Sequence, residues 1–164
     1  MALDRDWIIR HLPHQGAMCL LDVVEGWDAE RIHCRTARHR SADNPLRSRG
    51  RLSAVCAIEL AAQAMALHGA LLEGNRAVPR RGYLASVRGV DLLVRRLDDL
   101  EADLDVRAER LIGDGNQVIY GFSVQAEGHL LANGRAAVVL DAEVQPGGPC
   151  AQAAHSAPVG SGGR

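Results

Sequence analysis

Residues 52–73 read LSAVCAIELAAQAMALHGALLE, and this stretch decides the fold. Its apolar side chains fall on every face of an α-helix, which is the pattern of a helix enclosed by other parts of a protein. Ser53 is a typical N-cap residue, and Gly74 after Glu73 is a typical helix stop. The pattern therefore predicts one long central helix from about Ser53 to Glu73.

The segments on either side of this helix have the patterns of β-strands. Before it, residues 18–24 form an apolar run and residues 31–36 alternate polar with apolar side chains, which together indicate a hairpin. After it, the same alternation recurs over residues 102–108, 118–124 and 130–140. One enclosed helix followed by a run of strands predicts an α+β fold in which a curved antiparallel sheet wraps the helix.

Length and composition predict a single domain. The chain has 164 residues, of which 47% are hydrophobic and 24% are charged, and we expect residues 1–144 to form the domain. Residues 145–164 are rich in Gly, Pro, Ala and Ser without periodicity, which predicts a disordered tail. Nineteen basic residues, all arginine, nearly balance 20 acidic ones, and aromatic residues make up 3% of the chain. This balance argues against a nucleic-acid-binding protein.

The chain shows no pattern of a metal site, a disulfide framework or a membrane anchor. Its four cysteines are scattered and none forms a zinc-type spacing. The N-terminus lacks the basic and apolar regions of a signal peptide. The central helix carries Glu59, Gln63 and His68 and is too polar for a comfortable membrane span. We therefore expect no metal, no membrane span and a cytoplasmic protein.

Glu59 is the most informative residue because it places a carboxylate in an otherwise apolar helix. Burying a charge is costly unless the charge is paired, neutralised or beside a polar cavity. One interpretation is structural: Glu59 and Gln63, one turn apart, satisfy each other or a backbone group in the core. The other is functional: Glu59 faces a pocket and acts as a general acid or base.

Two motifs carry a resemblance to a known family. The first motif is Leu12-Pro13-His14 followed by residues 18–24, and it is similar to an L-P-H-x-x-P-[FM]-x-L-L-D-x-V segment. The second motif is residues 58–64, which are similar to an E-x-x-A-Q helix signature. In this order they resemble the hot-dog-fold 3-hydroxyacyl-acyl-carrier-protein dehydratases, over roughly residues 5 to 142. The chain is most similar to the divergent dehydratase-like proteins of aryl polyene pigment pathways. The resemblance implies a hot-dog fold.

The resemblance also implies a reaction, the loss of water from a 3-hydroxyacyl thioester in fatty acid or polyene biosynthesis. Glu59 would be the acid and Gln63 and Pro13 would contact substrate, while backbone N–H groups near Ala54 and Val55 would steady the thioester oxygen. No metal or redox cofactor is implied.

One position departs from the family pattern. The family's catalytic histidine lies fourteen residues before the glutamate, at a position that holds Pro45 in this chain. His14 is then the first candidate base. His39, in the loop before the helix and expected to be solvated, is the second. We expect His68 to belong to packing at the end of the helix.

The resemblance implies two kinds of partner. An acyl carrier protein would bring the substrate on phosphopantetheine, and the pairs Arg80-Arg81 and Arg95-Arg96 could receive this acidic protein, although both pairs could equally be solvated charges. A second hot-dog subunit, identical or different, would complete a dimer. Two other functions stay open: a non-catalytic subunit of a heterodimeric dehydratase, which Pro45 favours, and an acyl thioesterase on the same fold.

Overall fold

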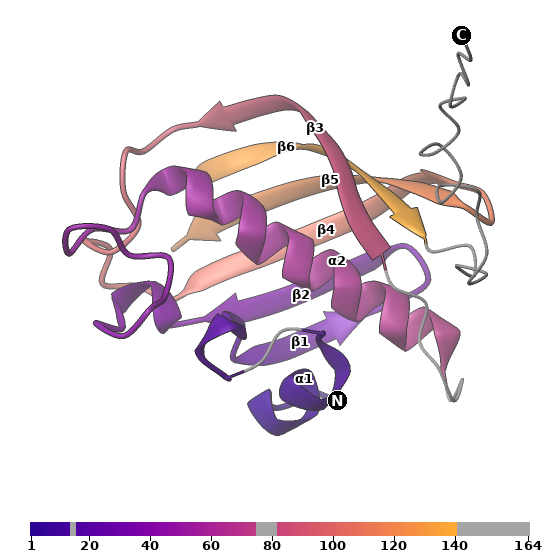
Figure 1. Ribbon diagram of the computed structural model, residues 1–164, viewed down its shortest axis with the longest axis horizontal. Helices are drawn as coiled ribbons and strands as arrows, with labels where there is room; N and C mark the ends of the chain where they lie inside the picture. Colours follow the sequence, from indigo (N-terminus) through magenta and orange to yellow (C-terminus); the bar gives the residue numbers. More distant parts are fainter. Residues whose placement is uncertain (14–15, 75–81, 141–164) are drawn as a thin grey trace, which may run out of the picture.

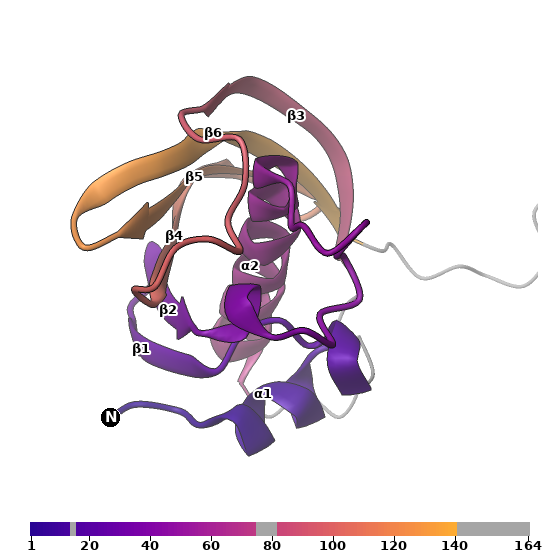
Figure 2. The same ribbon diagram turned by 90° about the vertical axis from the view of Figure 1, so that its left-hand side faces the viewer.

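The computed structural model describes residues 1–13, 16–74 and 82–140. A six-stranded antiparallel sheet curves around the long helix α2 (Ala57–Glu73), as Figures 1 and 2 show. The strand order is β1-β2-β4-β5-β6-β3. The strands are β1 (Val23–Trp27), β2 (Arg31–Thr36), β3 (Gly82–Leu92), β4 (Leu104–Gly113), β5 (Gln117–Ala126) and β6 (His129–Leu140). The predicted α+β hot-dog arrangement is confirmed, whereas the predicted tail at residues 145–164 lies outside the described residues.

The N-terminal part packs on the side of β1. Helix α1 (Arg5–His11) begins at the N-cap Asp4, whose side chain accepts a hydrogen bond from the Trp7 N–H at 2.9 Å. The hairpin predicted from the apolar run is present, but its first strand begins only at Val23. The residues just before β1 are held instead by the Arg5 side chain, which donates to the carbonyl oxygens of Cys19 and Leu21 at 2.8 and 2.9 Å.

The start of the central helix is fixed by the loop that precedes β4. The chain enters α2 through a 3-10 turn, η3 (Ala54–Cys56), capped by Ser53 as predicted. The carboxylate of Asp98 accepts a hydrogen bond from the Leu52 N–H at 2.8 Å and is also bound by the Arg96 guanidinium. These contacts lower the pKa of Asp98 far below its usual range.

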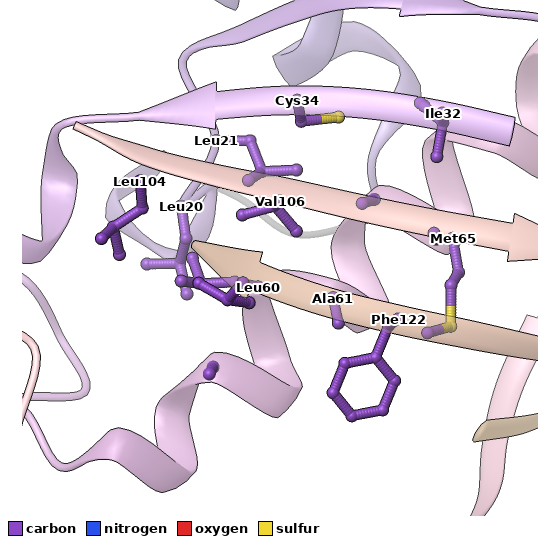
Figure 3. Close-up of a cluster of buried hydrophobic side chains, with 14 of the residues drawn as sticks. Leu20, Leu21, Ile32, Cys34, Leu60, Ala61, Met65, Leu104, Val106 and Phe122 are labelled. Atoms are coloured by element: carbon purple, nitrogen blue, oxygen red, sulfur yellow. The ribbon is translucent and has the colours of Figure 1, made fainter. Parts of the chain in front are cut away.

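The core lies between α2 and the concave face of the sheet. Figure 3 shows side chains of the helix meeting those of β2, β4 and β5 and of the segment before β1. The buried positions in the figure are Leu20, Leu21, Ile32, Cys34, Leu60, Ala61, Met65, Leu104, Val106 and Phe122. Gly134 on β6 lies against the Phe122 ring, where a Cβ would approach within 2.9 Å of a ring carbon. Its lack of a side chain allows this close packing.

The expectation that protein surrounds the helix on all sides is wrong. Val55 is 50% exposed, and Glu59, Ala62 and Ala66 on the same side of the helix are only partly buried. A single sheet covers one side of a helix, so the opposite side of α2 stays open. The segment Ala54–Glu73 is long and apolar enough to cross a membrane by composition, but it packs along the sheet as a core helix.

Candidate active site

Glu59 and Gln63 form a polar pair on α2 that contacts the chain segment before β1. The Gln63 side-chain amide donates to Glu59 Oε1 at 3.1 Å and to the Met18 carbonyl oxygen at 2.7 Å. Its Oε1 accepts from the Leu20 N–H at 2.8 Å. These bonds join the E-x-x-A-Q helix to the segment that follows the L-P-H motif, so the two sequence motifs meet in the fold.

Gln63 holds the Glu59 carboxylate, and both hydrogens of its side-chain amide are engaged. Its side chain is fully buried, with 0% exposure, and both of its amide hydrogens are engaged by Met18 and Glu59. These bonds leave no side-chain N–H of Gln63 for a polar contact with substrate, and its predicted role at the substrate stays a prediction. Glu59 itself is half-buried on the open side of the helix, so the expectation of a carboxylate inside the core is also wrong.

Asp22, from the same motif, holds the neighbouring backbone in place. Its carboxylate accepts from the Ala37 N–H at 2.8 Å and from the Arg38 guanidinium at 2.9 Å. The Thr36 hydroxyl lies 3.2 Å from the same carboxylate and 2.6 Å from the Leu20 carbonyl oxygen. Asp22 thus fixes the segment that Gln63 contacts. The sequence analysis did not assign it a role, because its partners lie about 15 residues away.

Only one of the two expected backbone donors is open to a substrate. The Ala54 N–H donates to the Arg95 carbonyl oxygen at 3.1 Å, so it is already engaged within the fold. The Val55 N–H has only a long contact of 3.4 Å with the Ser53 hydroxyl oxygen. Val55 lies at the exposed start of the helix, where the aligned peptide dipoles favour negative charge. Pro13, also expected at the site, is exposed.

The described histidines near the helix have structural partners. His39 is buried rather than solvated, and its Nε2–H donates to the Leu100 carbonyl oxygen at 2.9 Å. His68 is buried between the Tyr120 hydroxyl and the Asp28 carbonyl oxygen, both at 2.9 Å, which agrees with the predicted packing role. Burial lowers the pKa of both imidazoles and raises the pKa of Tyr120 to about 12. His14, the first candidate base, lies outside the described residues.

The two buried histidines predict a pH-dependent stability. A folded-state pKa below the unfolded value of 6.5 means that the unfolded chain binds more protons under acidic conditions. The free energy of unfolding should therefore fall as the pH drops through 6.5 toward the lowered pKa values. The slope should reach at most about 1.4 kcal/mol per pH unit for each histidine. Urea unfolding of the wild type and of His68→Gln between pH 7.5 and 5 measures it.

This prediction has an internal control in His11, which is exposed and stacks on Trp7. His11→Gln should leave the slope of the unfolding free energy against pH unchanged. His68→Gln should reduce this slope by at most about 1.4 kcal/mol per pH unit, which corresponds to one proton. An identical slope in the wild type and in His68→Gln would contradict the prediction.

Several arginines lie near the start of α2, but one of those expected to dock a carrier protein is held in an ion pair. Arg96 is bound to Asp98, whereas Arg95 is exposed and makes no ion pair with any described residue. Arg49 and Arg51 are exposed in the tight turn that leads to the helix, also without an ion pair in the described part of the chain. Arg80 and Arg81 lie outside the described residues. The sequence analysis missed Arg49 and Arg51 because they form no adjacent pair.

The family's histidine position is occupied by an exposed residue without a titratable group. Pro45 lies in a loop fixed by its neighbours, because the Asn44 side chain donates to the Arg38 carbonyl oxygen and accepts from the Leu46 N–H, both at 3.0 Å. Among the described residues, no three His, Cys, Asp or Glu side chains are grouped as metal ligands would be. The described site therefore consists of a positioned carboxylate and the start of a helix.

Comparisons with known proteins support the fold and identify the family. The family profile described as ApeP dehydratase, ApeP-like, matches residues 7–146. No curated protein matches the chain significantly. Among solved structures, the dehydratase heterocomplex ApeI:P from Xenorhabdus doucetiae has a TM-score of 0.71 and 24% identity, covering 82% of this chain and 90% of that chain. A mutant thioesterase from Pseudomonas aeruginosa has a TM-score of 0.59 and 12% identity, covering 84% and 94%.

The structural similarities establish the hot-dog fold, which dehydratases and thioesterases share. The family match distinguishes between them, because it spans the described domain from α1 to the end of β6 and favours a dehydratase-like function over a thioesterase. The resemblance seen in the two sequence motifs is thereby confirmed. The chain belongs to the ApeP-like dehydratase family.

Proposed function

We propose that this chain is a subunit of a 3-hydroxyacyl-acyl-carrier-protein dehydratase and that Glu59 is its general acid. The observation that carries the proposal is the hydrogen-bonded link from Met18 through Gln63 to Glu59. The amide holds the carboxylate on the open side of α2, beside the segment that follows the L-P-H motif. A carboxyl group held in this way can deliver a proton to a substrate lying along the open side of the helix.

The reaction balances with two protein groups. An imidazole takes the proton from the α-carbon of the thioester, the bond between the β-carbon and its hydroxyl breaks, and Glu59 protonates the departing oxygen to give water and a 2-enoyl thioester. The Val55 N–H and the positive end of the helix dipole stabilise the negative charge that develops on the thioester oxygen. His14 is the candidate base within this chain. A second subunit is the other source of the imidazole.

The substrate would arrive on the phosphopantetheine arm of an acyl carrier protein in the cytoplasm. Carrier proteins are acidic, and Arg49, Arg51 and Arg95, which pair with no carboxylate in the described part of the chain, lie near the start of the helix that bears Glu59. Exposed positive charge steers an acidic partner during encounter. Arg80 and Arg81 remain predicted docking residues, and Arg96 is less suited because Asp98 binds it.

A second hot-dog subunit is the expected partner of the open side of the molecule. Strand β3 is at the edge of the sheet and, among the described strands, pairs with β6 alone. Tyr83 and Leu84 in β3 and Leu93 just after it are exposed, with Leu93 at 58%. A long edge strand with apolar side chains requires a cover to avoid aggregation. The similar ApeI:P structure is a heterocomplex, which favours a different chain over a second copy.

The dimer prediction is tested by light scattering. The chain alone, or mixed with a second hot-dog subunit of a dehydratase, should have the mass of a dimer at micromolar concentration. Tyr83→Glu should weaken the dimer because it places a charge in the interface, whereas Glu127→Gln in an exposed hairpin turn should have no effect. A stable, soluble monomer under both conditions would refute the prediction.

Mass spectrometry of a 3-hydroxyacyl carrier protein tests the proposed function. The substrate is incubated with this chain, with the second subunit, and with both. Loss of one water that requires this chain supports a dehydratase. Equal water loss by the second subunit in complex with either wild-type chain or Glu59→Gln supports the non-catalytic alternative, which the exposed Pro45 favours. Release of the free acid would instead support a thioesterase.

A further inference from the structure

The face of the sheet turned away from α2 carries a trough with a volume of about 930 Å³. It runs across β2, β4, β5, β6 and β3, on the side of the sheet that no helix covers in Figures 1 and 2. Gly121 lies in the middle of this trough, paired with Glu109 on one side and Arg135 on the other. A Cβ at Gly121 would lie 3.6 Å from the Leu111 side chain, so Leu111 covers part of this position.

Most acidic groups beside the trough already have partners. Glu109 forms an ion pair with Arg31 at 3.1 Å, and Asp105 lies 2.6 Å from His33. The Asp28 carboxylate accepts hydrogen bonds from the backbone of the hairpin turn. Glu109 is thereby paired with Arg31, whereas hydrogen bonds from backbone N–H groups leave the negative charge of Asp28 in place.

Three arginines at the trough have no such partner. Arg107 on β4 and Arg135 on β6 line it, and Arg88 on β3 lies directly opposite Arg135 in the strand pairing. No ion pair joins any of the three to a residue that the structure describes. Asp91 is the one other carboxylate of the lining, and it too lacks an ion pair within that part of the chain. Like charges directly opposite each other destabilise a sheet, so this arrangement favours an anion between them.

We propose that this trough binds the phosphoryl group of a small organic phosphate. Guanidinium groups bind phosphate oxygens through paired, charge-assisted hydrogen bonds. Ser123 and Asn133, which pair across β5 and β6 between the arginines, add a hydroxyl and an amide donor. The volume suits a ligand of nucleotide size. The trough lies on the opposite face of the sheet from Glu59, so the site is separate from the proposed acid.

Titration calorimetry with ADP and with inorganic phosphate tests the site. Arg107→Gln and Arg135→Gln should each weaken binding about 10- to 100-fold, since each removes charge-assisted hydrogen bonds. The matched control Arg10→Gln, on the exposed side of α1, should bind as the wild type does. Tighter binding of ADP than of inorganic phosphate would identify an ester as the ligand, and equal binding would identify the phosphoryl group alone. Both results support the site.

The melting temperature, measured with and without ADP, is a second test of the site. Arg88→Gln should raise the melting temperature of the free protein, because it relieves the Arg88–Arg135 repulsion, and should reduce the further rise caused by ADP. Water loss from a 3-hydroxyacyl carrier protein should be unchanged in all three trough variants. Absence of binding by both phosphate compounds, binding of an acidic protein alone, or an equal loss in Arg10→Gln would overturn the proposal.

Discussion

Replacing Glu59 by glutamine should lower the turnover of a 3-hydroxyacyl carrier protein by roughly 10²- to 10⁴-fold, the range in which a positioned general acid contributes. Glutamine keeps the shape of the side chain and can still bond to the Gln63 amide through its carbonyl oxygen. It has no proton to give to the departing hydroxyl. Mass spectrometry of the carrier protein over time, with the second subunit present, measures the loss.

The stability of the same variant separates a catalytic from a structural Glu59. The free energy of unfolding should change by less than about 1 kcal/mol, because the carboxylate is half-buried and the replacement retains a hydrogen-bond acceptor. Glu127→Gln, in an exposed hairpin turn, serves as the matched control for activity and stability. A Glu59→Gln protein that loses stability but retains its activity would assign Glu59 to the structure alone.

Replacing His14 by alanine should reduce turnover by a comparable factor, roughly 10²- to 10⁴-fold, if its imidazole is the base. The reason is chemical: the family's usual histidine position holds Pro45, and His39 and His68 are both buried in hydrogen bonds to backbone or tyrosine. His14 is the histidine of the L-P-H motif. The pH profile of turnover should lose its acidic limb in this variant, because that limb reports titration of the base.

His11→Ala is the control for this experiment, since His11 is exposed in the same part of the chain. It should retain wild-type turnover. A silent His14→Ala combined with an inactive Glu59→Gln would mean that the second subunit supplies the imidazole. The active site would then combine an acid from this chain with a base from its partner.

The parts of the fold that sequence predicted are those set by local patterns. The end of the central helix follows from the Gly74 stop, whereas Ser53 caps the 3-10 turn Ala54–Cys56 and the α-helix itself begins only at Ala57. The alternation in β4, β5 and β6 is likewise a property of neighbouring residues. The open side of α2 could not be predicted, because the sequence does not distinguish an apolar residue that packs against the chain's own sheet from one that packs against another subunit.

The site shows the same division between local and distant contacts. Glu59 and Gln63 were expected on one side of the helix from their spacing, and they are hydrogen-bonded. Gln63 also bonds to Met18 and Leu20 in the segment before β1, and these partners lie more than 40 positions away in the sequence. The hydrogen bond from the Leu52 N–H to Asp98, just before the helix, likewise joins residues that are far apart in the sequence. Spacing identifies side chains that share an element, whereas tertiary contacts decide what each one does.

The anchoring of α2 has a consequence for how this family can diversify. Buried polar contacts fix the helix near both ends, through Leu52 and Asp98 before its first turn and through His68 near its last. Its open side, by contrast, carries the small residues Ala62 and Ala66, which are only partly buried. Substitutions at these two positions would change the shape of the surface that contacts an acyl chain or a subunit, without a large loss of stability of the fold. Selectivity can therefore evolve on one side of this helix while the opposite side preserves the fold.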